Sequence, residues 1–207
     1  MRLCLPTFVV LFWCSYAPGE ESVSVRRYDA GPLTVEDFKA DVPDPLPKLG
    51  RLTQYGLAGT DIRFTYEYRY RTVDGEIELT ATKLDVFGIF LPEKSWLYNG
   101  DANTLDHEQG HFDITQTYAL HVHLHLRKQI AEGKSLIGRG EDVPAAVKDL
   151  EEQIRAIIKP AYERADTAQL DYDRETKHGT LKAPQAEHRK AQLKVLKELV
   201  EELSSND

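Results

Sequence analysis

The residues best suited to chemistry in this sequence are His107, Glu108 and His111, which occur together as His107-Glu108-Gln109-Gly110-His111. On a helix with about 3.6 residues per turn, side chains four positions apart project from the same face, so both imidazoles can reach one metal ion. Glu108 lies beside them and can accept a proton from a water molecule on that ion without binding the ion itself. The spacing is that of the HExxH zinc metallopeptidases, and it predicts one zinc ion per chain with Glu108 as the general base.

A catalytic zinc site needs a third protein ligand and keeps one position open for water. The residues that follow His111 offer no ligand at a short helical spacing, so the third ligand is expected further along, in residues 171–179. Asp171, Glu175 and His178 occur there at steps of four and three, and they share one face if the helix continues that far. We predict His178 as the third metal ligand, with Glu175 as the alternative.

Further polar residues near the motif have alternative roles. Asp113 lies about 200° around the helix from the preceding histidine, so it is predicted either to support the site from behind or to be a surface charge. Tyr172 can donate a hydrogen bond to a developing oxyanion as a catalytic residue, but its place on an apolar stripe equally fits a core residue. His121, His123 and His125 alternate at two-residue spacing, and we predict surface or packing roles for them.

The elements that position these residues begin with a small antiparallel sheet. Residues 61–71 alternate apolar and polar side chains with a period of two, which predicts a strand. Asp74-Gly75 favours a tight hairpin into a second strand over residues 76–82. A further strand is predicted over residues 84–91.

Long helices follow the sheet. The first is predicted over residues 103–130, with Asn103 or Thr104 as its N-cap. A second long helix is expected to be kinked at Pro160, and a C-terminal helix is predicted over about residues 184–203. This order of elements is typical of the α+β class.

The start of the chain has the composition of a secretion signal. Arg2 precedes an apolar run, and small residues lie near Ala17, so residues 1–17 are predicted to be a signal peptide and residues 18–207 a single domain. Cys4 and Cys14 both lie in the signal, which leaves no thiolate in the mature chain. We expect a secreted or periplasmic protein without stable membrane insertion after cleavage, and an uncleaved anchor is the main alternative.

The net charge and the motifs of the chain exclude several classes of binding partner and of enzyme. The chain has 207 residues and a formal net charge of −8, which argues against a nucleic-acid backbone as the main partner. It contains neither a glycine-rich phosphate loop nor the Gly-x-Ser-x-Gly elbow of serine hydrolases. The expected partner is a peptide or protein substrate, and the oligomeric state is not set by the sequence.

Four segments of the sequence resemble a family of uncharacterised bacterial secreted proteins with a presumed zinc-dependent protease activity. They read LTVEDFK at residues 33–39, KSW at 94–96, HEQGHFDI at 107–114 and YDRETKHG at 172–179. The resemblance covers roughly residues 30–190. It implies a zincin-like metallopeptidase fold and a zinc site, and it implies these more firmly than any substrate.

Three functions are compatible with this pattern. An exported zinc metallopeptidase is the leading hypothesis, in which water activated by Glu108 attacks a peptide carbonyl. The alternatives are a non-catalytic periplasmic binding protein with a structural metal and a zinc amidase that acts on cell-wall material. Glu108 favours an enzyme, because a structural metal site does not need a carboxylate beside its first histidine.

Overall fold

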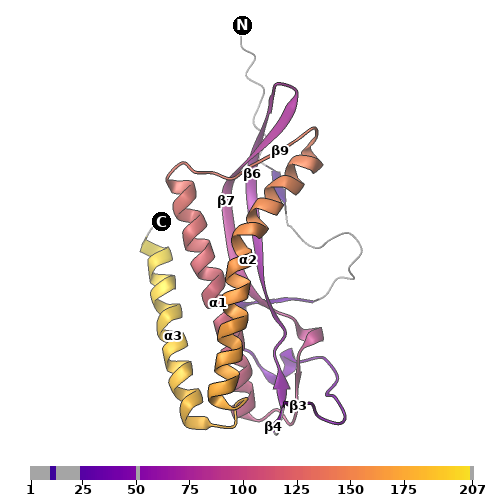
Figure 1. Ribbon diagram of the computed structural model, residues 1–207, viewed down its shortest axis with the longest axis vertical. Helices are drawn as coiled ribbons and strands as arrows, with labels where there is room; N and C mark the ends of the chain where they lie inside the picture. Colours follow the sequence, from indigo (N-terminus) through magenta and orange to yellow (C-terminus); the bar gives the residue numbers. More distant parts are fainter. Residues whose placement is uncertain (1–9, 13–23, 50–51, 206–207) are drawn as a thin grey trace.

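The computed structural model describes residues 10–12, 24–49 and 52–205. The chain has a mixed α/β architecture in which antiparallel sheets are combined with three long helices (Figure 1). This agrees with the predicted α+β class. In the part of the chain that the structure describes, no helix combines the length and the apolar character needed to cross a membrane.

The main sheet is built on two long strands, β6 (Thr60–Val73) and β7 (Glu76–Phe90). They form the predicted hairpin, and its turn residues Asp74 and Gly75 both have positive φ, at 52° and 91°. Such angles suit aspartate and glycine better than branched residues. The strong alternation of β6 therefore marked this hairpin correctly in the sequence.

Three short strands extend the main sheet, and all of them pair in the antiparallel sense. β1 (Val10–Phe12) pairs with β6, while β2 (Arg26–Arg27) and β9 (Ile137–Gly140) pair with opposite ends of β7. β1 falls within residues 1–17, the predicted signal peptide. The rest of that segment lies outside the described residues, so its role in export stays a prediction.

A β-bulge lies near the middle of β7. Between Glu67 and Tyr68 of β6 the partner in β7 jumps by two residues, which leaves Thr82 without a partner in β6. The bulge lets the buried side chains of β7 change from odd to even positions and still face the helices. We predicted two strands here, over residues 76–82 and 84–91, because the alternation breaks at this point; the structure joins them into one.

The three helices are α1 (Ala102–Ala131), α2 (Val143–Thr176) and α3 (Lys182–Ser205). α1 begins one residue earlier than predicted, because the side chain of Asp101 caps it by accepting hydrogen bonds from the backbone N–H groups of Asn103 and Thr104. Those two residues were predicted as the cap and are instead the donors. α2 continues through Pro160, and its axis changes direction along its length (Figure 1).

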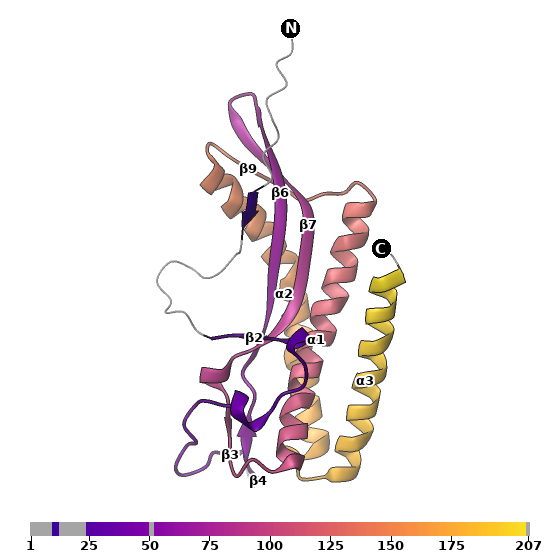
Figure 2. The ribbon, with the colours of Figure 1, turned by 180° about the vertical axis from the view of Figure 1, so that it is seen from behind.

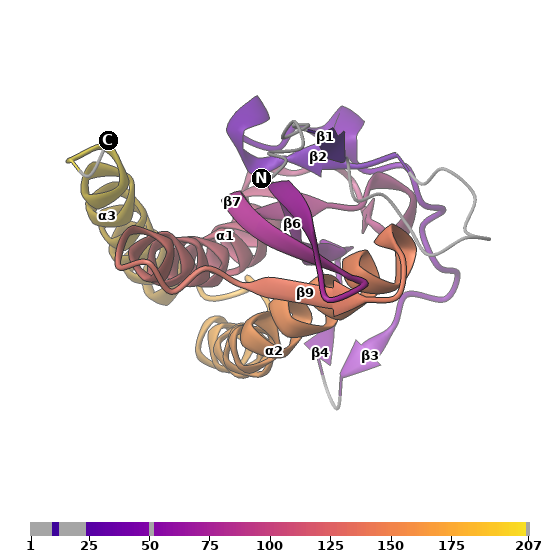
Figure 3. The same ribbon diagram turned by 90° about the horizontal axis from the view of Figure 1, so that it is seen from above.

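The core lies between the main sheet and the first two helices. Seen from behind, β6 and β7 lie in front of α2, with α1 beside them (Figure 2). Buried side chains of both strands and both helices form one cluster that includes Tyr66, Tyr68, Leu126 and Ile154. α3 packs on the outer side of α1, away from the sheet (Figure 3), through a smaller apolar cluster.

Two small sheets lie at the end of the molecule where α1 begins. β3 (Lys48–Leu49) pairs with β4 (Leu52–Thr53), and β5 (Gly56–Leu57) pairs with β8 (Trp96–Leu97). β5 directly precedes β6 and contacts α1. The strand closest to the histidine motif is therefore a short one that the sequence did not predict.

Candidate metal centre

The two histidines of the motif lie one turn apart near the start of α1. Both are buried, with exposed fractions of 3% for His107 and 8% for His111. Their Nε2 atoms are 3.3 Å apart and their rings meet edge to face. The two side chains therefore converge, as their four-residue spacing requires.

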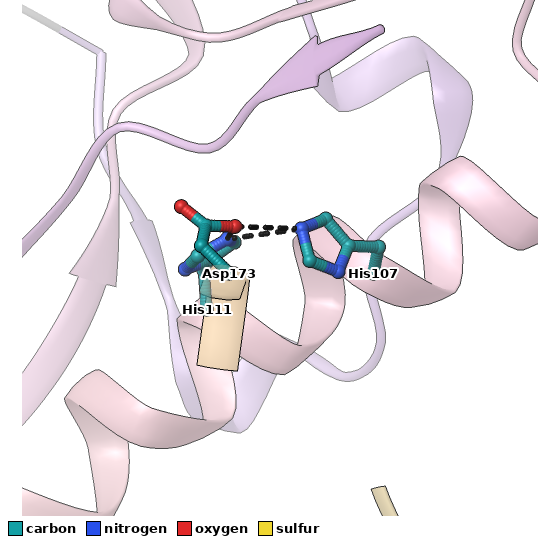
Figure 4. A group of neighbouring side chains, drawn as sticks. All are labelled: His107, His111 and Asp173. Carbon is teal, nitrogen blue, oxygen red and sulfur yellow. Dashed lines mark hydrogen bonds and ion pairs between the residues drawn. The ribbon is translucent and has the colours of Figure 1, made fainter. Parts of the chain in front are cut away.

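A carboxylate from α2 completes the cluster. Asp173 Oδ1 lies 3.0 Å from His107 Nε2 and 3.1 Å from His111 Nε2, and the three side chains face one another (Figure 4). Around a tetrahedral ion with ligands at about 2.1 Å, neighbouring donors are about 3.4 Å apart. The observed spacings are close to this value, and two imidazoles with one carboxylate match the donor set of catalytic zinc sites.

The charges in the cluster also suit a cation. Burial opposes ionisation of Asp173, but hydrogen bonds with His107 and His111 outweigh burial and hold the pKa of this carboxyl well below its usual range. Burial lowers the pKa of His107, which favours the neutral imidazole that binds metals. Burial acts on His111 in the same direction, but its contacts with Asp173 and Glu108 prevail and raise its pKa.

His178 contacts the cluster through Asp173. Its Nδ1 lies 3.2 Å from Asp173 Oδ1. It is outside the group of donor atoms that all lie within 4.8 Å of one another, which His107, His111 and Asp173 form. The structure therefore places Asp173 where His178 was predicted, and His178 is a neighbour of that carboxylate.

The alternative ligand, Glu175, points away from the cluster. Its Oε2 lies 2.8 Å from Nε2 of His188 on α3, while Asp171 pairs with Arg174 at 2.8 Å. Residues 171, 175 and 178 were expected to share one helical face only if the helix continued that far, and this condition is not met because α2 ends at residue 176. The sequence did offer a signal for Asp173, since a carboxylate at the edge of a buried apolar stripe lies close to the neighbouring helix.

Glu108 is buried beside the cluster and against β5. Only 3% of its surface is exposed, and the backbone N–H of Ala58 donates a hydrogen bond to it. Burial raises the pKa of Glu108 from 4.5 to about 7, against the opposing effects of His111 and this hydrogen bond. A Cβ atom at Gly56 would lie 2.6 Å from Glu108 Oε1, so the close approach of β5 requires glycine. A carboxyl with this pKa can accept and release a proton near neutral pH.

A cavity of about 400 Å³ gives access to these groups. It is lined by the cluster residues together with Glu108 and His178. β5 contributes Gly56 and Leu57 to its wall, and α2 contributes Leu170. A ligand in this cavity can therefore contact the donor atoms, the candidate base and the edge of a strand at the same time.

Tyr172 packs against the two histidines and does not line the cavity. Its ring stacks on His107 at 4.8 Å and meets His111 edge-on at 5.3 Å, and it is 1% exposed. Its hydroxyl lies against Gly110, where a Cβ atom would be 2.5 Å away, and Tyr172 is not among the residues that line the cavity. Of its two predicted roles, the geometry favours the core residue over the donor to an oxyanion.

Asp113 is fully buried on the other side of α1. The Tyr28 hydroxyl donates to its Oδ1 at 2.8 Å, the Gln109 side-chain amide donates to the same atom at 2.6 Å, and Arg189 donates to Oδ2. Arg189 also donates to Asp106 at 3.1 Å, so this side chain of α3 joins two carboxylates of α1. Asp113 therefore supports the motif helix and is not a surface charge. Nothing in the sequence indicated Arg189 as its partner.

The chain belongs to a family described as bacterial protein of unknown function (DUF922), whose model matches residues 25–179. The match contains the three cluster residues and Glu108, and it ends before α3 begins. No curated protein and no solved structure matches the chain.

Proposed function

We propose that this member of the DUF922 family is a zinc-dependent peptidase with Glu108 as its general base. The observation that carries the proposal is a buried carboxyl with a pKa of about 7 next to a His-His-Asp donor set, on one shared cavity. A structural metal would require no such carboxyl, and its site would be closed by a fourth protein ligand. The arrangement of these groups supports catalysis over mere binding.

The three cluster residues have the chemistry to hold the ion through His107 Nε2, His111 Nε2 and Asp173 Oδ1. Zinc bound there would polarise a substrate carbonyl and lower the pKa of a water molecule beside it. The pair of histidines on one helix, the base between them and a carboxylate ligand from a later helix together support a zincin-like arrangement.

Glu108 carries out the proton transfers in this proposal. Its carboxylate accepts a proton from the attacking water and then delivers that proton to the leaving amine nitrogen. The Ala58 N–H orients the carboxylate, and burial keeps bulk water away from it. Zinc at this site would displace the ring protons from the Nε2 atoms of His107 and His111, and the ring of Tyr172 packs against both imidazoles.

The test combines metal analysis with a cleavage assay on the wild-type protein and Glu108→Gln. We expect the wild-type protein and the variant each to bind one zinc ion per chain, as measured by elemental mass spectrometry. Glu108→Gln should lose at least about a hundredfold in the rate of peptide cleavage. Glu187→Gln, which changes an exposed carboxylate on α3, is the matched control and should retain full activity.

The other possible results would contradict the proposal or favour one of the alternative functions. Full hydrolysis by Glu108→Gln would overturn the proposed mechanism. Zinc binding by the wild-type protein without any hydrolysis would support a binding protein. Hydrolysis of cell-wall fragments but not of peptides would support the amidase alternative.

A further inference from the structure

The walls of the cavity beside the cluster carry unusually exposed apolar side chains. Tyr55 directly precedes β5 and is 40% exposed, and Leu57 belongs to β5 and is 42% exposed. Leu170 of α2 is 69% exposed. All three line the cavity. Leu170 precedes Asp173 by three residues on the helix, so its side chain lies on the same face as the candidate ligand. Exposed apolar groups gathered at one site mark a surface that binds another apolar group.

On the edge of β5 that lines this cavity, the Ala58 N–H donates to Glu108, and no described strand pairs with Gly56. Tyr98 N–H donates to Tyr55 C=O at 2.8 Å, so Tyr55 directs its backbone groups towards β8. Because paired residues alternate along an antiparallel ladder, Leu57 also faces β8, whereas Gly56 and Ala58 face the other edge. Among the described strands β5 pairs with β8 alone. The backbone groups of Gly56 are therefore placed to pair with an extended peptide.

A second hollow continues from the cavity past Asp173 and His178. The two share these residues and Leu170, and the second hollow is also lined by Leu49 and Leu52. A side chain that extends from the cavity in this direction would meet leucine side chains. A large apolar side chain fits these walls better than a polar one.

The two ends of this groove differ in charge. Asp166 lines the first cavity, two turns before the cluster on α2, whereas Arg174 and Lys177 line the second hollow at the end of the same helix. Arg174 is partly compensated, because it pairs with Asp171 at 2.8 Å. Lys177 is exposed and forms no ion pair with any described residue. An acidic group on the ligand would therefore be favoured at the Lys177 end.

We propose that the groove accepts an extended polypeptide segment that adds to the cavity-lining edge of β5, places a large apolar side chain against Leu170, and directs an acidic side chain towards Lys177. This inference rests on the proposed function, since it names the substrate class of the same site. A polysaccharide or a flat lipid surface would use neither the strand edge nor the opposite charges at the two ends.

The experiment measures peptide binding without turnover. The zinc-loaded Glu108→Gln variant is titrated into short fluorescent peptides, and the fluorescence anisotropy of the peptide is recorded. Each peptide has a central leucine and a single glutamate, which is placed before the leucine in one peptide and after it in another. Matched peptides replace leucine by serine or glutamate by lysine. We expect the peptide with a central leucine to bind about tenfold more tightly than the peptide with serine at that position. On one flank, the peptide with glutamate should bind about threefold more tightly than the peptide with lysine.

Substitutions in the same background assign the preferences to residues. Leu170→Ala should abolish the leucine preference, and Lys177→Glu should reverse the choice between glutamate and lysine. Leu193→Ala, which changes a 53% exposed leucine on α3 outside both hollows, should alter neither preference.

Binding and cleavage separate the two proposals. Failure of every peptide to bind, or preferences that Leu170→Ala and Lys177→Glu leave intact, would overturn the inference about the groove. If the preferred peptide binds as expected but the zinc-loaded wild-type protein does not cut it, the peptidase proposal fails while the groove stands.

Discussion

Asp173 Oδ1 lies 3.1 Å from His111 Nε2 although the two residues are 62 positions apart, so α2 supplies the carboxylate that completes a cluster begun on α1. This contact yields the first prediction. Asp173→Ala should lower the affinity for zinc more than about a hundredfold, because it removes a side chain that binds the ion directly and not one that only orients a ligand. The measurement is competition with a fluorescent zinc chelator.

His178→Ala provides the comparison for that experiment. His178 contacts Asp173 at 3.2 Å, so its loss should weaken zinc binding by about ten- to a hundredfold, as for residues that orient a ligand. His125→Ala, which changes an exposed histidine on the same helix as the motif, is the control. A larger loss for His178→Ala than for Asp173→Ala would restore His178 as the third ligand.

The sequence predicted the part of the site that depends on local geometry. His107, Glu108 and His111 lie within one helix, and a periodicity of about 3.6 residues fixes their relative directions before any tertiary contact forms. Asp173 was missed because its position depends on where α2 ends and how that helix crosses α1. Residue spacing alone contains neither quantity, although the place of Asp173 at the edge of the apolar stripe of α2 indicated that it lies close to a neighbouring helix.

The fold shows the same division. The long alternation of β6 and the apolar stripe of α2 were sufficient to predict a sheet followed by helices. β5 has two residues and no periodicity, and its place beside Glu108 depends on the contact of Gly56 with that side chain. The strand that lines the cavity was therefore not among those predicted from the sequence.

Tyr172 provides the second prediction. Its hydroxyl is buried without a hydrogen-bond partner among the described residues, and it does not line the cavity. Tyr172→Phe should therefore keep peptide cleavage within about twofold of wild type and leave stability unchanged or slightly raised. Tyr172→Ala should lower zinc affinity, because the ring that packs against His107 is removed. A drop of a hundredfold in cleavage by Tyr172→Phe would identify the hydroxyl as a catalytic donor.

The third prediction concerns pH and the metal-free protein. The folded chain raises the pKa of Glu108 from 4.5 to about 7, so folding favours its protonated form. The stability that this group contributes is complete below pH 4.5 and is lost as the pH rises towards 7. Glu108→Gln cannot ionise and should exceed wild type in free energy of unfolding by on the order of 3 kcal/mol at pH 8, with no difference at pH 4.

Urea denaturation in the presence of a chelator, repeated across this pH range, measures the difference. Glu187→Gln changes an exposed carboxylate and should match wild type at every pH. A constant difference between Glu108→Gln and wild type would show that Glu108 titrates alike in the folded and unfolded chain. Zinc should reduce the difference, because a cation near Glu108 stabilises its ionised form.

The fourth prediction concerns Arg189, which lies beyond the residues matched by the family model. It donates to the fully buried Asp113 on the rear of the motif helix. Arg189→Met leaves that carboxylate buried without its cation, which should destabilise the protein by about 3 kcal/mol. Lys190→Met, an exposed neighbour on α3, should cost less than about 0.5 kcal/mol.

A double-mutant cycle separates the ion pair from simple packing. Asp113→Asn keeps the shape of the side chain and removes its charge, so Arg189→Met should cost less in that background than in wild type. Tyr28 and Gln109 can still donate to the side-chain carbonyl oxygen that this substitution retains, which keeps this part of α1 in place. Additive costs in urea denaturation would mean that the two charges do not interact. Zinc affinity should fall together with stability in Arg189→Met, because the same helix carries His107 and His111.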